Sequence, residues 1–511
     1  MKNILKLGFL FIVLSVLFVV LRMYNDSVIY SGITQLRGAS IVKALSILIT
    51  LSAFLIGCVI FLENRNPSKT LTWLIVLGIF PVVGFFAYLL FGQNYRKKRM
   101  FQKKAVLDEK KFLRYKETED NHITPQKHQE LLFRLAESYG KLALSHCTET
   151  KVLTNGEETF AKILAVLKKA KHHIHMESYI VRHDTLGTEI KELLIQKVKE
   201  GVQVRFLYDA VGCLHLSKQY IADLRMAGVD IVPFFPVHFP ILNDRINYRN
   251  HRKIIVVDGN KGFVGGLNIG DEYLGKNPFY GFWRDTHLYM RGEAVQSLQL
   301  LFMQDWFYMT EQTLQDEKFL CAERVQDDNL GAVQLVAGGP DNKWETIKIL
   351  YFAMISSARK SIWIATPYFI PDDDVLGALK MAAIAGIDVR LLVPSKPDKK
   401  TVFYASRSYF PELLEVGAKI YEYTKGFMHS KIVIVDGEIA SIGTANMDMR
   451  SFHLNFEVNA FLYGTPSVKE LVQDFENDLL VSEEIDLDQF QNRSIFLRVI
   501  ESTYRLLSPL L

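Results

Sequence analysis

The chain has 511 residues, 49% of them hydrophobic, and a formal net charge of +4. This length exceeds that of one ordinary domain and supplies enough apolar material for a sizeable core. A net charge this small gives no sign of a nucleic-acid partner, and four widely spaced cysteines without a CxxC pair argue against a disulfide framework or a zinc site.

Three long apolar runs occupy the N-terminal part of the chain, at 4–21, 44–62 and 71–91. Each run is about long enough to cross a bilayer as a helix. We therefore predict that residues 1–91 form a membrane region. No small-residue cleavage site follows the first run, which disfavours a removed signal peptide. Whether that run spans the membrane or acts as a signal anchor stays open at this point.

A basic cluster, YRKKRMFQKK, follows the third run. Basic clusters beside membrane spans stay on the cytoplasmic side, so we predict a multi-pass protein of the cell membrane with cytoplasmic catalytic domains. The cluster can also attract anionic membrane lipid, with a free energy of about 1 kcal/mol per basic residue near the surface. Residues 92–150 are charged and helix-prone, and we interpret them as a cytoplasmic linker.

The rest of the chain contains two similar stretches, at 151–330 and 331–511. In each, a helical pattern runs into a short apolar strand, as in FAKILAVLKKAKHHIHMESYIV and LYFAMISSARKSIWIATPYFI, and further helices and strands follow in the same order. Short apolar strands between amphipathic helices predict an α/β fold. The shared order indicates an internal duplication. We predict two α/β/α sandwich domains related by a pseudo-twofold axis, the second ending in a C-terminal helix.

Each half carries one HxKxxxxD motif with identical spacing. The polar residues of the two copies are His251, Lys253 and Asp258 in the first half and His429, Lys431 and Asp436 in the second. One such motif alone is a weak signal, but two in register inside a larger repeat are strong. Histidine and lysine two positions apart on a strand point to the same face. Two half-sites could thus face one ligand across the pseudo-twofold axis.

The residue types of the motif point to phosphodiester chemistry. An imidazole beside an ammonium group favours an anion between them, and a phosphate satisfies both. One neutral imidazole can attack phosphorus, and a second can protonate the leaving oxygen. We therefore predict a covalent phosphohistidine intermediate. We assign His251 as the nucleophile and His429 as the acid and then the base, and the opposite order stays open.

Further polar residues follow each motif and are candidates for binding phosphate or orienting the histidines. They are Asn268, Asn446, Thr444, Asp285 and Glu457. A histidine that changes its protonation state needs an orienting carboxylate, and Asp285 in FWRDTH and Glu457 in LNFEVN are the candidates. A structural salt bridge is an equally good interpretation of either carboxylate. Thr444 aligns with Gly266, so only the second copy can add a hydroxyl donor.

Neither a cofactor nor a metal is predicted. The stretch GDEYLGKN nearly matches a phosphate-binding loop, but Asn277 stands where serine or threonine is required, and Pro278 follows instead of a helix. The histidine-rich stretch KHHIH, at 171–175, lacks ligand partners at a suitable spacing. We interpret it as a polar entrance to a strand.

The duplicated motif resembles the phospholipase D superfamily, and the fuller sequence resembles its bacterial cardiolipin synthases. The matching stretches are IHMESYIV, LNDRINYRNHRKIIVVDG, FVGGLNIGDEYLG, WRDTH, IATPYFIPDD, MHSKIVIVDG and GTANMDMRSFHLNFE. The resemblance implies that one phosphatidylglycerol donates its phosphatidyl group reversibly to a second one, giving cardiolipin and glycerol. It also implies that both His-Lys-Asp sets are catalytic. From the residues alone, turn capping is the more economical interpretation of Asp258 and Asp436.

The residues alone lead only to a membrane-tethered enzyme that acts on a phosphodiester through a phosphohistidine. A phospholipase D hydrolase and a phosphatidylserine synthase could use the same site. A nuclease of the superfamily and a lipid-binding protein with a relic site are further alternatives. Two intact motifs count against the relic, and the three apolar runs count against the nuclease. The sequence leaves the oligomeric state open.

Overall fold

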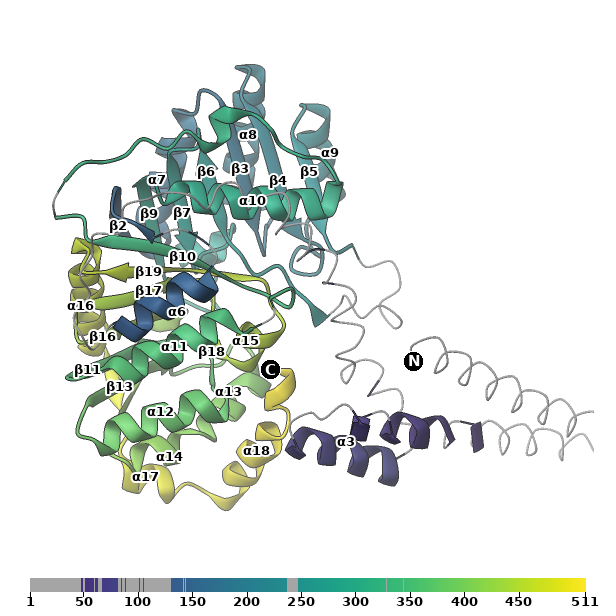
Figure 1. The fold of residues 1–511 in the computed structure, drawn as a ribbon, viewed down its shortest axis with the longest axis vertical. Helices are drawn as coiled ribbons and strands as arrows, with labels where there is room; N and C mark the ends of the chain where they lie inside the picture. The colour runs from purple at the N-terminus through teal and green to yellow at the C-terminus, as the bar shows by residue number, and fades with distance from the viewer. Residues whose placement is uncertain are drawn as a thin grey trace, which may run out of the picture. The chain divides into compact units, whose positions relative to one another are not determined.

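The computed structural model describes most of the chain after residue 143 and parts of the chain before it (Figure 1). The described residues are 47–48, 51–58, 60–62, 67–80, 84, 88, 101, 104, 130–140, 142, 144–236, 247–327, 329–342 and 344–511. The chain divides into two compact units, residues 1–97 and residues 98–511.

The first unit contains helix α3 (Pro67–Ile79), which covers the beginning of the predicted span 71–91. Helical residues also occur within the predicted span 44–62, whereas the run 4–21 lies outside the described residues. Within the part of the chain that the structure describes, no helix combines the length and the apolar character needed to cross a bilayer.

The first half of the second unit is built on a seven-stranded sheet in the order β2-β9-β7-β6-β3-β4-β5. Its strands are β2 (Thr148–Thr154), β3 (His173–Ser178), β4 (Gln203–Asp209), β5 (Asp230–Phe234), β6 (Ile254–Val257), β7 (Lys261–Gly265) and β9 (Thr286–Gly292). Its helices are α7 (Asn155–Lys168), α8 (Thr185–Lys199), α9 (Lys218–Met226) and α10 (Val295–Thr310). The strands β3, β4 and β5 run parallel and are connected by α8 and α9.

The second half repeats this arrangement in a nine-stranded sheet, ordered β1-β10-β19-β17-β16-β11-β13-β14-β20. Its strands are β1 (Leu144–Ser145), β10 (Ala332–Gly338), β11 (Ser361–Ala365), β13 (Asp388–Pro394), β14 (Lys419–Tyr423), β16 (Ile432–Val435), β17 (Ile439–Gly443), β19 (Glu457–Tyr463) and β20 (Ser482–Glu484). Its main helices are α11 (Thr346–Ser357), α12 (Asp373–Ile384), α13 (Lys400–Arg407), α14 (Phe410–Leu414), α16 (Pro466–Leu479) and α18 (Ile495–Arg505). The seven strands from β10 to β14 reproduce the order of the first sheet, which confirms the predicted duplicated α/β fold.

Part of the predicted linker 92–150 belongs to the folded second half. Helix α6 (Glu130–Gly140) packs against α11 and β10 and buries Leu132 and Phe133, and β1 pairs with the edge of β10. The Phe133 ring lies 4.4 Å from the ring of Tyr463. The apolar side of α6 explains this packing, because its leucine and phenylalanine residues recur at helical spacing among the charges that suggested a linker.

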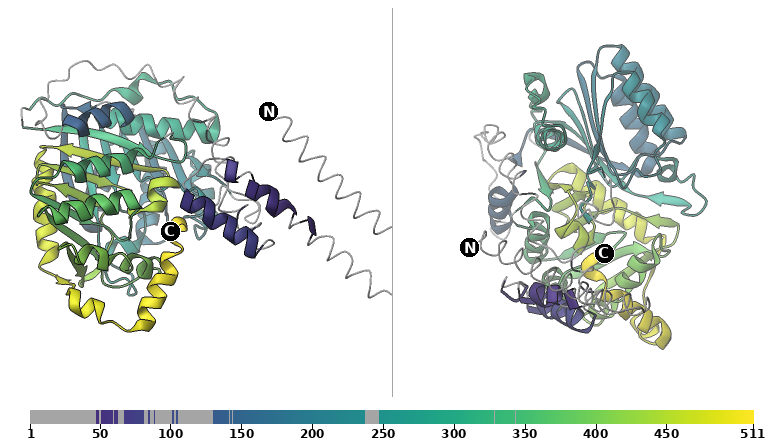
Figure 2. Two further views of the ribbon diagram at one scale, coloured as in Figure 1. Left: turned by 60° about the horizontal axis from the view of Figure 1, so that its bottom comes forward. Right: turned by 90° about the vertical axis from the view of Figure 1, so that its right-hand side faces the viewer.

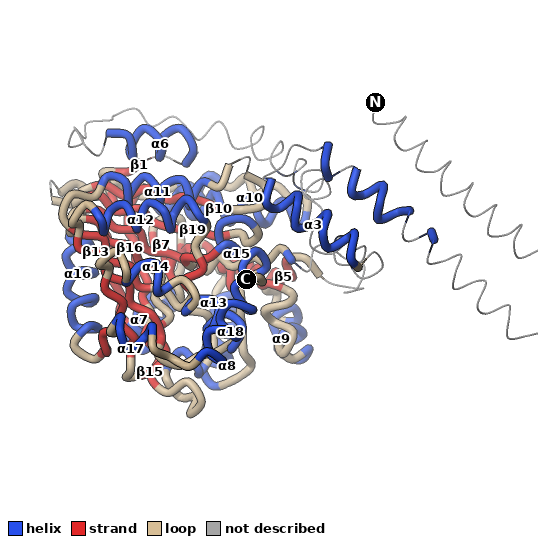
Figure 3. The backbone as a smooth tube through the Cα atoms, turned by 90° about the horizontal axis from the view of Figure 1, so that it is seen from below, coloured by secondary structure: helices blue, strands red, loops and turns tan. Residues whose placement is uncertain are grey.

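The two motif strands, β6 and β16, are buried on both faces, and successive side chains of each strand point to opposite faces. Ile254 and Val256 of β6 join Ile432 and Ile434 of β16 in one apolar cluster shared by the two halves. The intervening residues of each strand belong to the core of their own half. Figures 2 and 3 show the strands inside the second unit and helices such as α11 and α12 outside them. The motifs are therefore mounted on rigid, fully buried strands.

Candidate active site

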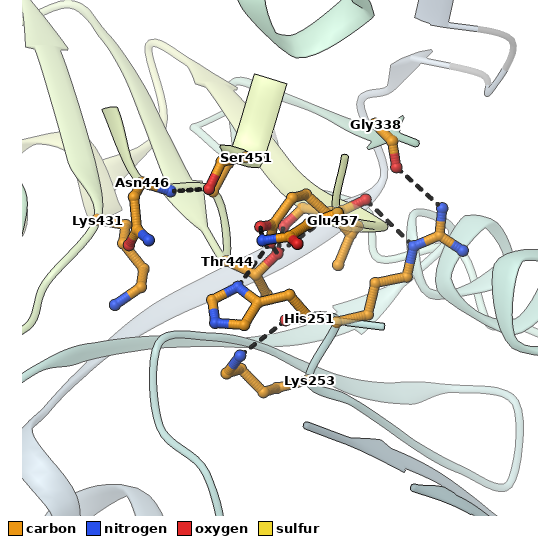
Figure 4. Close-up of polar contacts among 12 residues, drawn as sticks. His251, Lys253, Gly338, Lys431, Thr444, Asn446, Ser451 and Glu457 are labelled. Carbon is orange, nitrogen blue, oxygen red and sulfur yellow. Dashed lines mark hydrogen bonds and ion pairs between the residues drawn. The ribbon is translucent and has the colours of Figure 1, made fainter. Parts of the chain in front are cut away.

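The histidine and lysine of each motif directly precede their strand. Strand β6 begins at Ile254, one residue after Lys253, and β16 begins one residue after Lys431. The predicted placement on the strand itself is therefore shifted by a few residues toward the strand entrance. Figure 4 shows Lys253, Lys431 and Glu457 gathered around the ring of His251. The two half-sites come together where the two halves of the chain meet.

Backbone hydrogen bonds between the halves position each histidine. The amide of His251 donates to the carbonyl of Phe456 at 2.9 Å, and the amide of His429 donates to the carbonyl of Arg284 at 2.7 Å. In the second case the contact extends into a short parallel pair of strands, β15 (Gly426–Met428) and β8 (Phe282–Arg284). Each histidine is thus held beside the segment that carries the candidate carboxylate of the other half.

The candidate carboxylates contact the histidines crosswise. Nδ1 of His251 lies 2.9 Å from Oε2 of Glu457, and Nδ1 of His429 lies 2.6 Å from Oδ2 of Asp285. Both carboxylates are fully buried. When Nδ1–H is donated to a carboxylate, the electron pair of each neutral ring is on Nε2. The structure thus brings Asp285 and Glu457 to the histidines, and each half orients the histidine of the other.

Further donors hold the two carboxylates in equivalent ways. Oε1 of Glu457 accepts from Nδ2 of Asn455 at 3.1 Å, and Oδ2 of Asp285 accepts from Nε1 of Trp283 at 3.3 Å. Asn455 and Trp283 each stand two residues before their carboxylate. The hydroxyl of Thr444 donates to Oε2 of Glu457 at 2.6 Å. Of the two roles predicted for Thr444, the structure favours orientation of the carboxylate.

The hydroxyl has no counterpart in the first half. Gly266 stands where the second copy has Thr444, and a Cβ atom at Gly266 would lie 2.0 Å from Oδ1 of Asp285. A threonine cannot be accommodated there unless Asp285 moves. The first half therefore combines Asp285 with a glycine at position 266, whereas the second half combines the longer Glu457 with Thr444.

Burial sets the protonation state of the site. It lowers the pKa of His251 to about 4 and that of His429 to about 3. Burial also lowers the pKa of Lys253 to about 7 and that of Lys431 to about 8. Each lysine further lowers the pKa of the histidine in the opposite half, as like charges do at short range. Both imidazoles are therefore neutral at neutral pH and suited to attack an electrophile.

The carboxylates remain ionised despite their burial. Burial alone raises the pKa of Glu457, but His251, Lys253 and the hydroxyl of Thr444 outweigh it and hold the pKa below its usual value. Asp285 behaves in the same way beside Lys431 and His429. Two ammonium groups and two ionised carboxylates thus surround the neutral imidazoles. A phosphodiester anion would favour the charged form of both lysines.

The side chains of the two predicted asparagines are engaged locally. Oδ1 of Asn268 accepts from the amide of Ile180 at 3.2 Å, and its Nδ2 donates to the hydroxyl of Tyr273 at 3.1 Å. Nδ2 of Asn446 donates to Asp448 at 3.0 Å. Asn446 lies close to Lys431 in Figure 4. The structure therefore gives both asparagines a role in fixing the loops that follow β7 and β17.

Asp258 and Asp436 lie outside the site, at the opposite ends of the motif strands. Asp258 lies seven positions after His251, which in an extended chain corresponds to about 23 Å. Each carboxylate accepts hydrogen bonds from three consecutive backbone amides, those of Lys171, His172 and His173 and those of Arg359, Lys360 and Ser361. Both aspartates adopt positive φ, at 52° and 55°. The catalytic role implied by the resemblance is thus replaced by capping of the adjacent strand.

Aromatic residues that the sequence did not single out pack against both histidines. The ring of Tyr179 lies 4.8 Å from that of His251, and Nζ of Lys253 lies 5.3 Å from the centre of the Tyr179 ring. The ring of Trp283 lies 4.9 Å from that of His429. Tyr179 aligns with Pro367 in the repeat, so comparing the two halves gave no signal for it.

The structure also gives the histidine-rich stretch 171–175 a local role. His173 and His175 are buried, and both contact the side-chain amide of Gln299. The ring of His175 stacks on Phe302 at 4.6 Å. Among the described residues, no group of three or more histidine, cysteine, aspartate or glutamate side chains is arranged to hold a metal ion.

Comparison with known proteins places this geometry in a family. The family described as "Cardiolipin synthase, PLD-like domain" matches residues 163–306 and 351–479. Cardiolipin synthase 2 of Bacillus cereus is 74% identical over 465 residues, with 90% of each chain covered. Cardiolipin synthase 2 of Bacillus anthracis is 71% identical over 514 residues, with both chains covered completely. The chain belongs to the cardiolipin synthase family of the phospholipase D superfamily.

Membership in the cardiolipin synthase family confirms the predicted family and the predicted class of enzyme, a phosphatidyltransferase. The N-terminal part also matches a family, described as "Phospholipase_D-nuclease N-terminal", over residues 50–93. Among solved structures, phosphatidylserine synthase of Haemophilus influenzae superposes with a TM-score of 0.58 at 16% identity. That comparison covers 74% of this chain and 100% of the other. It shows that the two proteins share a fold.

Proposed function

We propose that the enzyme transfers a phosphatidyl group from one phosphatidylglycerol to the terminal hydroxyl of a second, giving cardiolipin and glycerol. The observation that carries this proposal is the crosswise pairing of two neutral histidines with buried carboxylates beside two lysines. This arrangement offers a nucleophile, a proton carrier and a cradle for one phosphodiester anion. The names of the highly similar relatives supply the lipid product, and the site supplies the chemistry.

The proposed reaction has two steps, with His251 as the nucleophile. Nε2 of His251 attacks phosphorus, the bond from phosphorus to the glycerol oxygen breaks, and His429 gives that oxygen its proton. A second phosphatidylglycerol then enters, and its hydroxyl loses a proton to His429 as the oxygen attacks phosphorus and the P–N bond breaks. The bound anion favours the protonated form of His429 that the first step requires. One phosphodiester replaces another, so the exchange is reversible.

The proposed location is the cell membrane, with the N-terminal runs as spans and the domains 151–330 and 331–511 in the cytoplasm. Lipid substrates and the basic cluster after residue 91 support this topology. Confinement to the bilayer surface raises the effective concentration of the acceptor lipid relative to a dissolved acceptor. This explains how a lipid hydroxyl can compete with water at the phosphohistidine. A reporter fused after Leu511 should be accessible only from the cytoplasmic side, and labelling from outside intact cells would contradict the topology.

The decisive experiment supplies phosphatidylglycerol alone, in vesicles, to the full-length enzyme. Equal amounts of cardiolipin and free glycerol are expected. Phosphatidic acid as the main product would instead establish a hydrolase. Adding serine tests the remaining alternative, because a phosphatidylserine synthase would then form phosphatidylserine in preference to cardiolipin.

A further inference from the structure

Helix α18 is an amphipathic element with one well-packed side. It begins after Ser494, whose hydroxyl accepts from the amide of Leu497 at 3.3 Å. One side packs against α13, where Tyr504 stacks on Tyr404 at a ring distance of 5.8 Å. Figure 1 shows α18 at the periphery of the second half. This packing fixes which side of the helix points away from the protein.

The opposite side of α18 presents large apolar side chains. Ile495, Phe496, Val499 and Leu506 have exposed fractions of 78%, 71%, 58% and 81%. At 100° per residue they lie on one side of the helix, away from Tyr504. Exposed apolar side chains gathered on one surface indicate an interaction site.

The charges on this helix select an anionic partner. Arg498 is exposed at the border of the apolar side, and the outward positions carry no carboxylate. The one acidic residue of the helix, Glu501, is buried and pairs with Arg493 at 2.5 Å and with Arg407 at 3.7 Å. An apolar face bordered by arginine is the pattern of a helix that lies in the interface of an anionic bilayer.

The helix is tied to the active-site region through the C-terminal residues. The hydroxyls of Tyr409 and Ser508 are hydrogen-bonded at 2.9 Å, and the amide of Arg450 donates to the carbonyl of Leu511 at 3.0 Å. Arg450 lies in the short helix α15 (Met449–His453), and the hydroxyl of the next residue, Ser451, accepts from the amide of Asn446 at 3.1 Å. The C-terminal residues that follow α18 therefore contact the segment after β17 that carries Asn446.

We propose that the outward side of α18 binds the surface of an anionic phospholipid bilayer and holds the active site at the level of the lipid headgroups. The proposal rests on the proposed function for its lipid substrate, but the binding itself can be measured without turnover. Its occupant is the bilayer, and a protein segment covering the helix is the competing outcome of the test.

The test places an environment-sensitive fluorophore on the helix in the full-length chain. Cys58, Cys147 and Cys321 are replaced by serine, and Phe496→Cys is labelled with NBD. In phosphatidylglycerol vesicles we expect a blue shift, about a twofold gain in emission and quenching by lipids with a shallow doxyl group. Met381→Cys, at an equally exposed position on α12, is the matched control and should show neither change. A label at 496 that behaves like the one at 381, or an apolar signal without doxyl quenching, would overturn the proposal.

A kinetic test separates this proposal from the proposed function. Phe496→Asp combined with Val499→Asp should lower turnover of phosphatidylglycerol in vesicles about three- to tenfold. Turnover of a short-chain phosphatidylglycerol dispersed as monomers should stay unchanged, which also establishes that the variant is folded. Equal losses on both substrates would contradict a membrane role. A wild-type enzyme that forms cardiolipin from neither substrate would refute the proposed function and leave the fluorescence result intact.

Discussion

The two histidines differ in what stabilises their carboxylate partners. Glu457 accepts from Thr444, whereas Asp285 has Gly266 at the equivalent position. The Thr444 hydroxyl also accepts from the amide of Val458 at 2.9 Å. A single hydroxyl therefore joins the backbone of β19 to the carboxylate that orients His251.

We predict that Thr444→Val lowers kcat about tenfold, because Glu457 loses a donor and holds His251 less firmly. The variant should also lose about 1–2 kcal/mol of unfolding free energy, since the amide of Val458 loses its acceptor. Steady-state assays and urea denaturation measure the two effects. Thr444→Ser keeps both hydrogen bonds and is the matched control. Equal kcat values for the valine and serine variants would refute this role of the hydroxyl.

The pH dependence of the free enzyme follows from the site. The nucleophile is neutral above the pKa of His251, about 4, and Lys253 keeps its charge below its pKa of about 7. We therefore expect kcat/KM to rise with pH through about 4 and to fall above about 7. Bound phosphodiester stabilises the ammonium, so the alkaline limb of kcat should lie at higher pH than that of kcat/KM.

Lys253→Arg provides the control for this assignment. The guanidinium stays charged throughout the accessible range, so the alkaline limb of kcat/KM should move upward or disappear even if overall activity falls. An alkaline limb that stays in place in this variant would show that another group causes it.

At the level of elements, the motif strand separates two functions that the HxKxxxxD pattern joins in sequence. Its entrance carries His251, and its exit carries Asp258, which caps the backbone amides at the start of β3. We expect Asp258→Asn to lower the unfolding free energy by about 1–3 kcal/mol, because charged acceptors make the stronger hydrogen bonds. The kcat of the folded enzyme should change less than twofold.

His251→Asn is the complementary variant for that experiment. It should abolish turnover while the denaturation midpoint stays close to that of the unaltered enzyme. If Asp258→Asn instead lost activity at full stability, the motif aspartate would have to act on the site from a distance, and the capping assignment would fail.

The sequence predicted those features that depend on local pattern. The order of helices and strands revealed the duplicated sheet, and the repeated spacing revealed His251 and His429. The need for an orienting carboxylate suggested Asp285 and Glu457, although a structural salt bridge was an equally good interpretation of either one. It did not reveal which carboxylate serves which histidine. That pairing depends on β8 and β15 meeting between the halves, and no pattern within one half encodes it.

Other differences have the same origin in three-dimensional contact. Helix α6 appeared to be linker because its charges stand out in the sequence, and its apolar side gains meaning only against α11 and β10. Tyr179 has no repeat partner, so it became visible only by its packing on His251. The sequence left open whether Thr444 binds phosphate or orients a histidine, and only the contact of its hydroxyl with Glu457 favours the second role.

At the scale of the whole molecule, the active site is a product of the junction between halves. The contacts of His251 with Glu457 and of His429 with Asp285 cross that junction, and so do both backbone hydrogen bonds that position the histidines. Neither half contains a complete orienting pair. The duplication thus supplies two similar strands that each carry a histidine and a lysine at their entrance. Because each half provides the carboxylate that orients the histidine of the other half, the two halves depend on each other for catalysis.

Burial of histidines on this scale also makes the fold sensitive to acid. Among the residues that the structure describes, burial lowers the pKa of five histidines below the ordinary value of 6.5, and they are His173, His175, His251, His287 and His429. Below pH 6.5 the unfolded chain takes up protons that the folded chain does not bind. The unfolding free energy must therefore fall as the pH drops from about 6.5 toward 4.

His287→Asn tests this effect outside the catalytic groups. The pKa of His287 is lowered by burial to about 4, and its Nδ1 accepts from the amide of Leu267 at 3.4 Å. In the second half Asn459 stands in the equivalent position and accepts from the amide of Ala445 at 3.2 Å. Asparagine can thus supply the same hydrogen-bond acceptor without a group that titrates.

We expect the unfolding free energy of the His287→Asn variant to lie within about 1 kcal/mol of the original at pH 7.5 and to fall less between pH 6.5 and 5. Urea denaturation at a series of pH values measures this, with exposed His215→Asn as the control. If the unfolding free energy of His287→Asn depended on pH as steeply as that of the original protein, His287 would bind protons equally in the folded and unfolded states. The acid sensitivity would then arise from other groups.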